Sequence, residues 1–482
     1  MKRALAIAAA LLVAAALWAA PRPAHAPGVA TRDFEAYWAA GRTALERASP
    51  YQRGALWARE RTVPGVSPER DELLPFVSPP MILPVFASLA RLPYAWARVV
   101  WLSLLALACA LGAWAAFRLA GFRGGDAAVA GILAVTFSPL TATLALGQVS
   151  GIAFAGLALA LVALRARSGF DALALACSAV QPNLAIAALA GARRATLAPF
   201  AVAAALVAAA TAASLFAFGG GIGAYAVTLL RHGASETGDV IQFSLSSMAA
   251  PLIPAAGPAL AVLLLAASAA LAAAFARRSA PERSVAFACA LLPFAMPFFH
   301  DQDLIAVLIP AAFALAAWQR KGAITGALGA LFVAVDWLDL AQQPASRYED
   351  VLLAAAAACA VAALHPTRRA LWLALPVAIA GMLAPLAAAH PVPIWPFSLP
   401  PHFHVPANLG AAATWAREQR AAGLLRTQPL AILLRSLALL GCALLALSLW
   451  SAPEERAPLR ARATPRSRTP GPARAGSPAD PG

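Results

Sequence analysis

Charged residues are scarce in this sequence. Asp, Glu, Lys and Arg make up 12% of the chain, about half the share that a soluble domain carries. Hydrophobic residues make up 61% and come in long uninterrupted runs. Such runs are typical of lipid-spanning helices, so the composition excludes an ordinary soluble enzyme and predicts an all-α polytopic membrane protein.

The sequence also lacks the common motifs of nucleotide and serine chemistry. It contains no P-loop, no dinucleotide-binding glycine pattern and no G-x-S-x-G elbow. The donor of any reaction should therefore come from the membrane or the outside. All five cysteines lie inside apolar runs, which favours small core residues over disulfides or metal ligands. We expect no metal and no cofactor.

The first apolar run extends from Ala4 to Ala20. The sequence at 24–26 mimics a signal-peptide cleavage site, but the run is longer than the usual apolar core of about 7–15 residues. We interpret it as a retained first membrane helix; a cleaved signal peptide is the alternative. In either case residue 21 onward faces the outside.

The polar segment over 21–95 forms the predicted first outer loop. Apolar residues at helical spacing predict an amphipathic helix at about 34–48, lying on the membrane surface. The prolines that follow forbid a regular spanning helix, so 76–92 is predicted as a short interfacial or re-entrant piece.

Most of the remaining chain is predicted to span the membrane, giving about 12–14 transmembrane segments in all. The candidate spans are 96–117, 127–146, 150–164, 197–217, 254–276, 284–299, 303–318, 323–340, 350–364, 370–389 and 429–450. The segments 231–247 and 391–428 are predicted as outer loops, and Arg231 and His232 in the first are candidate phosphate contacts.

The run 170–192 is interrupted by Gln181-Pro182-Asn183, and each half is too short to cross alone. If it enters and returns as a hairpin of two half-helices, the later loops obey the positive-inside rule. Polar residues at the tip of such a broken helix should line a cavity.

The net charge of +15 is then a topology signal rather than a nucleic-acid footprint. The loops assigned to the cytoplasm hold fifteen basic and three acidic residues, and the tail holds six Arg and three acids. Both termini are predicted to be cytoplasmic. The domain prediction is one transmembrane unit over 1–450 and a basic tail over 451–482, whose Pro, Arg, Ala, Gly and Ser content predicts disorder.

Few polar residues are available for chemistry. Asp33 precedes the predicted surface helix, where it could act as a general base or simply cap the helix. The sequence Phe299-His300-Asp301-Gln302-Asp303 places one His and two carboxylates between apolar runs, which is typical either of a functional cluster or of a tight polar turn. The further candidates for substrate binding are Glu35, Gln148, Gln181, Asn183 and Arg231.

Several of these motifs, in this order, resemble glycosyltransferase family 87, polytopic enzymes of the GT-C fold whose best-known members are polyprenol-phosphomannose-dependent mannosyltransferases. Asp33-Phe34 with Tyr37 and Ser49-Pro50-Tyr51 is similar to the first outer loop of that family. Ser78-Pro79-Pro80, followed by Leu92-Pro93 and Trp101, resembles the entry into its second helix. Gly147-Gln148 resembles its "GQ" turn, and His300 with Asp301 and Asp303 resembles its late "H/D" turn.

The resemblance implies an inverting transfer of a hexose, mannose above all, from a polyprenyl-phosphate sugar to a lipid or glycan acceptor. The reaction would occur on the outer face of the bacterial inner membrane, with Asp33 as the base. The chain departs from the family at Gln181, where a Lys is usual, so a positive charge that could hold the donor phosphate is missing. Arg32, Arg231 and Arg347 are candidate substitutes.

Two other readings remain open. Broken helices and buried polar residues also suit a transporter or flippase for lipid-linked saccharides. The Gln181 departure also suits an inactive relative that acts as an assembly partner. The sequence does not predict the oligomeric state.

Overall fold

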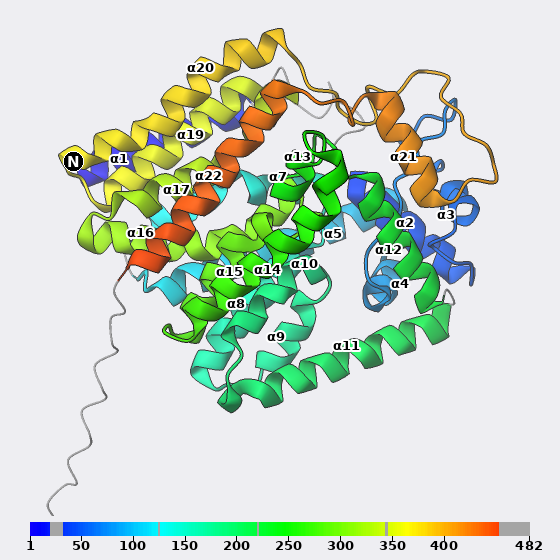
Figure 1. Ribbon diagram of the computed structural model, residues 1–482, viewed down its shortest axis with the longest axis horizontal. Helices are drawn as coiled ribbons and strands as arrows, with labels where there is room; N and C mark the ends of the chain where they lie inside the picture. The colour runs from blue at the N-terminus through cyan, green and yellow to red at the C-terminus, as the bar shows by residue number, and fades with distance from the viewer. Residues whose placement is uncertain (20–31, 124–125, 219–220, 343–345, 453–482) are drawn as a thin grey trace, which may run out of the picture. The chain divides into compact units, whose positions relative to one another are not determined.

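The computed structural model describes residues 1–19, 32–123, 126–218, 221–342 and 346–452 (Figure 1). The cleavage-like sequence at 24–26 and the predicted tail, apart from Ser451 and Ala452, lie outside the described residues. The described residues are 75% helical and contain no strand, which confirms the all-α polytopic membrane fold.

The α-helices, in chain order, are α1 (Lys2–Ala19), α2 (Arg32–Leu45), α3 (Arg53–Glu60), α4 (Leu83–Leu89), α5 (Tyr94–Ala120), α6 (Asp126–Val135), α7 (Ser138–Leu146), α8 (Ser150–Ala166), α9 (Asp171–Ser178), α10 (Pro182–Ala185), α11 (Leu197–Phe218), α12 (Ile222–Ser235), α13 (Leu245–Ala249), α14 (Gly257–Ala276), α15 (Pro281–Ala295), α16 (Leu308–Lys321), α17 (Ile324–Ala334), α18 (Asp339–Gln342), α19 (Ser346–Leu364), α20 (Leu375–Ala389), α21 (Ala411–Ala422) and α22 (Pro429–Ser451). The 3₁₀ segments are η2 (Pro80–Ile82), η3 (Ile186–Gly191), η4 (Arg194–Thr196), η5 (Pro254–Ala256), η6 (Asp301–Val307) and η7 (Arg368–Ala374).

In the described part of the chain, seven helical stretches are long and apolar enough to cross a membrane, or eight if the pair α6 and α7, bent by 54°, is one span. This is fewer than the 12–14 segments expected. The difference arises because several predicted spans are short: α8 has 17 residues and α15 has 15. At 1.5 Å per residue neither reaches the roughly 30 Å of a hydrocarbon core.

The predicted break at Gln181 is present. It separates α9 from α10, which begins at Pro182, where the missing N–H of proline is tolerated. Arg165 lies 4.0 Å from Glu282, and Arg193 donates to the Ser279 carbonyl at 3.1 Å. Both ends of the broken segment therefore lie beside the start of α15, as the hairpin prediction requires.

Further arginines lie at this end of the bundle. Arg278 and Arg283 donate to the carbonyls of Trp450 and Leu449, at the end of α22. Arg165 also donates to the Leu119 carbonyl at the end of α5. Four of the arginines assigned to cytoplasmic loops, Arg165, Arg193, Arg278 and Arg283, thus share one end of the helical bundle, which we call the basic end.

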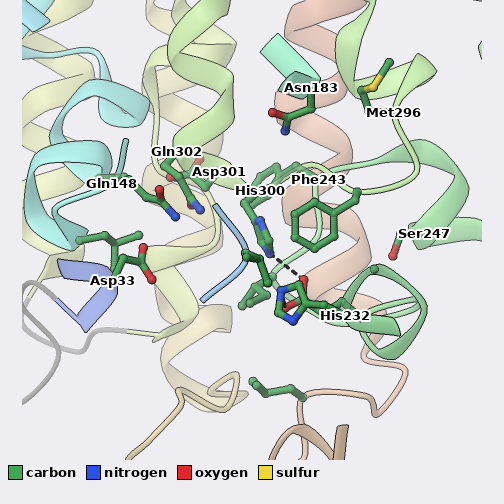
Figure 2. Close-up of a pocket in the computed structure, with 18 of the residues that line it drawn as sticks. Asp33, Gln148, Asn183, His232, Phe243, Ser247, Met296, His300, Asp301 and Gln302 are labelled. Carbon is green, nitrogen blue, oxygen red and sulfur yellow. Dashed lines mark hydrogen bonds and ion pairs between the residues drawn. The ribbon is translucent and has the colours of Figure 1, made fainter. Parts of the chain in front are cut away.

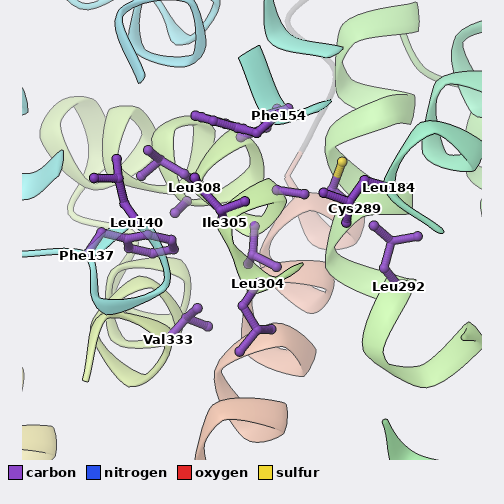
Figure 3. Packing of buried hydrophobic residues seen from close by; sticks show 14 of the residues in the cluster. Phe137, Leu140, Phe154, Leu184, Cys289, Leu292, Leu304, Ile305, Leu308 and Val333 are labelled. Atoms are coloured by element: carbon purple, nitrogen blue, oxygen red, sulfur yellow. The ribbon is translucent and has the colours of Figure 1, made fainter. Parts of the chain in front are cut away.

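The most buried stretch is η6 with α16, which runs through the centre of the core. Leu304, Ile305 and Leu308 are almost completely buried, and side chains of α7 and α17 surround them (Figure 3). Because this central stretch begins at Asp301, its apolar packing fixes the polar residues His300–Asp303 at the end of a rigid element.

The predicted surface helix corresponds to α2, which is shifted by two or three residues and packs against α4. Gly41 is required at the crossing, since a Cβ there would lie 2.2 Å from the Phe86 carbonyl oxygen. Phe34, two turns before Gly41, stacks on Tyr94 and Trp101 of α5. Asp33 is thereby held at the start of a firmly packed helix.

The segment 391–428, predicted as an outer loop, packs beside the loop after α3 and contains α21. Asp71 accepts from the Val405 N–H at 2.9 Å, and Arg70 donates to the Leu399 carbonyl at 3.0 Å. The segment 231–247 was also expected to be a loop, but it contains the end of α12 and all of α13. Residues 32–92 and 391–428 together form what we call the cap.

Candidate active site

A cavity of about 1470 Å³ lies between the cap and the helical bundle. Six of the sequence-predicted site residues line it: Asp33, Gln148, Gln181, Asn183, His300 and Asp301. Figure 2 shows Asp33 and Gln148 on one side, with His300, Asp301 and Gln302 beside them and Asn183 farther along. Side chains from distant parts of the chain therefore share one chamber.

Asp33 lies in the first turn of α2 rather than at its N-cap, and it is partly exposed to the cavity. Burial raises the pKa of its carboxyl group to about 7, against the opposing effects of His300 and a hydrogen bond from Gln148. A carboxylate with a pKa near neutrality is suited to take a proton from a substrate.

The Gly147-Gln148 turn holds the partner of Asp33. Gly147 ends α7 with a φ of 76°, and its carbonyl accepts from the Trp101 indole at 2.7 Å. The Gln148 side-chain oxygen accepts from the Tyr37 hydroxyl and from the Val149 N–H. Because that oxygen is occupied, the amide nitrogen is the group left to donate to Asp33.

Asp303 is completely buried and does not line the cavity. It accepts four hydrogen bonds, from Ser150 Oγ (3.0 Å), Gln181 Nε2 (3.0 Å), Asn183 Nδ2 (2.9 Å) and the His300 N–H (3.2 Å). It joins α8, the broken helix and η6, and so holds both hairpin-tip side chains at the cavity wall.

Glu236 organises the opposite side of the cavity. Its carboxylate contacts His300 Nε2 at 2.9 Å and His232 Nε2 at 3.1 Å. It also accepts from the Trp415 indole at 2.7 Å and from the Gln242 amide. This network ties α12, α21 and the start of η6 together.

The charges in this network are set by the contacts with Glu236. Burial alone would raise the pKa of Glu236, but the two histidines outweigh it and lower the pKa to about 2. Burial would lower the pKa of His300, but Glu236 outweighs it and raises the pKa to about 9. The pKa of His232 is lowered, chiefly by burial. At neutral pH the cavity therefore has one cationic histidine, His300.

Three predicted site residues do not line the cavity. Asp303 lies behind its wall, Arg231 is exposed elsewhere, and Glu35 is buried in the cap with Arg32 at 3.0 Å. Arg32 does line the cavity, but it also pairs with Glu72 at 3.2 Å. Arg347 lies outside the cavity and donates to the Leu340 carbonyl at 2.7 Å.

Sequence reasoning missed several residues that the fold brings to the cavity. The sequence assigns Glu236 no role and places His232 in a predicted loop, whereas the structure places both at the end of α12 with the helical spacing i, i+4. Four acids also line the wall: Asp336, Asp339, Glu349 and Asp350. No motif marked these acids, because they belong to the ends of three different helices.

In the described ranges, no group of three or more His, Cys, Asp or Glu residues is arranged to hold a metal ion. Part of the remaining wall is apolar. The lining includes Leu229, Leu230, Pro251, Pro254, Ala261 and Leu353. A chamber with one polar wall and one apolar wall could hold a polar headgroup and part of a lipid chain.

Comparison with known proteins relates part of the chain to a known family. The sequence profile of glycosyltransferase family 87 matches residues 76–299 and so confirms the resemblance inferred from the motifs. The match includes Gln148, Gln181 and Glu236, ends one residue before His300, and does not reach Asp33. No curated protein and no solved structure matches the chain.

Proposed function

With the match to glycosyltransferase family 87 as the premise, we propose that this glycosyltransferase moves a hexose from a polyprenyl phosphate to a hydroxyl of a lipid or glycan acceptor. Mannose is the sugar implied by the family resemblance. The reaction would take place at the outer face of a bacterial inner membrane, with both termini cytoplasmic. One observation supports the proposal above all. Asp33, which can accept a proton, and His300, which is cationic at neutral pH, line the same cavity.

In this proposal Asp33 is the general base. Its carboxylate takes the proton of the acceptor hydroxyl while that oxygen attacks the anomeric carbon. The bond between the anomeric carbon and the phosphate oxygen breaks, and its electron pair leaves with the polyprenyl phosphate. Because attack and departure occur on opposite faces, the anomeric configuration inverts. The hydrogen bond from Gln148 would orient the carboxylate.

His300 is the proposed partner of the donor phosphate. Its Nε2 is held by Glu236, so Nδ1 is the ring nitrogen left to donate to an anion. Negative charge grows on the phosphate as the bond to the sugar breaks, and a fixed cation would stabilise it. His300 would thus supply the charge that the Lys-to-Gln difference at 181 removes.

The apolar wall supports a place for the polyprenyl chain. Leu229 and Leu230 are exposed on α12, and the wall continues along η5 and the start of α14. These apolar residues line the same cavity as His300. A lipid chain on this wall would hold the sugar phosphate near His300.

The reaction itself is tested by transfer in proteoliposomes. Purified protein would be given radiolabelled polyprenyl-phosphate mannose and a membrane-lipid extract as acceptor. The proposal expects label in a new glycolipid, with an inverted anomeric configuration by NMR. Label that crosses the bilayer without transfer would contradict it and favour a transporter. The absence of both would favour an inactive assembly partner.

A further inference from the structure

One part of the cavity wall is lined by carboxylates from four separate segments. Asp301 begins η6, Asp336 follows α17, Asp339 begins α18, and Glu349 and Asp350 lie in the first turns of α19. Asp301 and Asp350 each interact electrostatically with Asp336 and Asp339. We call these five residues the acidic end.

Asp350 gives an independent indication that this end takes a ligand. It is 8% exposed, and its Oδ2 has no hydrogen-bond partner among the described residues. A buried carboxylate oxygen without a donor is costly, and proteins usually satisfy such groups. Because Asp350 lines the cavity, a ligand there can supply the missing donor.

The described cavity wall offers little positive charge to these acids. Arg32 is its only Lys or Arg, and that side chain pairs with Glu35 and Glu72 in the cap. His300 pairs with Glu236 at 2.9 Å and, of the five acids, interacts electrostatically with Asp301. The acidic end therefore suits a ligand that carries its own positive charge.

We propose that the acidic end binds a protonated amine of the acceptor, with Asp350 as one of its hydrogen-bond acceptors. An ammonium group has three N–H donors and tolerates irregularly placed carboxylates. A divalent cation needs oxygens converging at about 2.0–2.6 Å, and no described group is arranged in that way. The inference rests on the proposed function in one respect, that the acceptor enters the cavity beside Asp33.

The test measures binding without requiring transfer. Full-length protein in detergent would be titrated calorimetrically with octyl 6-amino-6-deoxyglucoside, its 6-acetamido derivative and octyl glucoside. The first probe is cationic at pH 7 and the other two are neutral. We expect the amine to bind at least about tenfold more tightly than either neutral probe.

Asp350→Asn should remove most of this preference, while Glu46→Gln, an exposed acid outside the cavity, should retain it. Thermal unfolding of each variant would confirm that it is folded. If Asp350→Asn does not fold, Glu349→Gln, on the same turn and only partly buried, is the second variant, with a smaller loss of preference expected.

Equal affinity for the three probes would overturn the inference and indicate recognition of neutral sugar hydroxyls. An undiminished amine preference in folded Asp350→Asn would also overturn it. So would Asp350-dependent binding of Mg²⁺ without an amine preference. Sugar transfer to neutral acceptors without a preference for the amine probe would contradict this inference but not the proposed function. Binding of the amine probe without any sugar transfer would contradict the proposed function but not this inference.

Discussion

Asp33 and Asp303 are two aspartates of one site with opposite surroundings. Asp303 is completely buried and accepts four hydrogen bonds, so each of its oxygens has partners. Asp33 is partly exposed to the cavity, and its pKa is raised to about 7 by burial. The four hydrogen bonds of Asp303 hold its side chain and its neighbours in place, whereas the carboxyl group of Asp33 can exchange a proton near neutral pH.

The difference separates structure from chemistry within a single cavity. Asp303 supports Gln181, Asn183 and the backbone of His300 from behind the wall. Asp33 stands on α2, in the cap, and faces the space where a substrate would lie. An aspartate in a sequence motif can therefore serve either purpose, and the number of its donors distinguishes the two.

The largest structural effect should follow from Asp303→Ala. The change leaves the buried Ser150 hydroxyl and other donors without an acceptor, so we expect the free energy of unfolding to fall by about 2–4 kcal/mol. Denaturant unfolding in detergent would measure it. Asp33→Asn should lower the free energy of unfolding by less than about 0.5 kcal/mol, because this substitution removes a desolvated charge. Equal losses in the two variants would break the distinction.

His300→Gln should lower kcat/KM for the donor by about 10–100-fold, because a cation–phosphate contact is lost. The charge of His300 lowers the pKa of Asp33, so the substitution should also raise the pKa of Asp33. His232→Gln is the matched control, since His232 also contacts Glu236 but has a lowered pKa. Steady-state kinetics with varied donor would measure both variants. A similar loss in both would assign the effect to Glu236 rather than to the charge.

The pH dependence of kcat/KM should be bell-shaped. Asp33 must be deprotonated to act as a base, so activity should rise with pH up to about 7. His300 must keep its proton, so activity should fall as pH passes about 9. Each limb should change by about tenfold per pH unit. A profile whose acidic limb is identical in Asp33→Asn would assign that limb to another group.

Gln181→Lys should have the smallest effect, about threefold or less in donor KM. The Gln181 side chain already contacts Asp303 at 3.0 Å, so a lysine there would pair with that carboxylate. Donor titration would measure the change. A gain of tenfold or more would show that this position, and not His300, dominates recognition of the donor phosphate.

Much of the fold could be predicted from local patterns. Long apolar runs correspond to the helices, and Pro182 marks the break in the hairpin. The amphipathic pattern after Asp33 corresponds to α2. The helices α12 and α21 were missed, because their moderate polarity is equally typical of a solvated loop.

The site was predicted only where one short motif held the residues together. Gln148 and His300 belong to such motifs, and both line the cavity. Glu236 and His300 are in contact although they are 64 residues apart in the sequence. Asp350, in α19, interacts with Asp301, at the start of η6, only in the folded chain. Arg231 and His232 are neighbours in the sequence, and only the helical phase of α12 brings His232 to the cavity and leaves Arg231 exposed. Contacts of this kind arise from tertiary packing, which one sequence does not encode locally.

The most direct test of the account is the transfer rate of Asp33→Asn at saturating donor and acceptor. Wild type, Asp33→Asn and the surface control Glu46→Gln would be compared in proteoliposomes, with equal thermal stability as the criterion of folding. The account predicts a fall in kcat of about 10²–10⁴-fold for Asp33→Asn and an unchanged rate for Glu46→Gln. A folded Asp33→Asn protein that transfers sugar within a few-fold of wild type would contradict the assignment of the base.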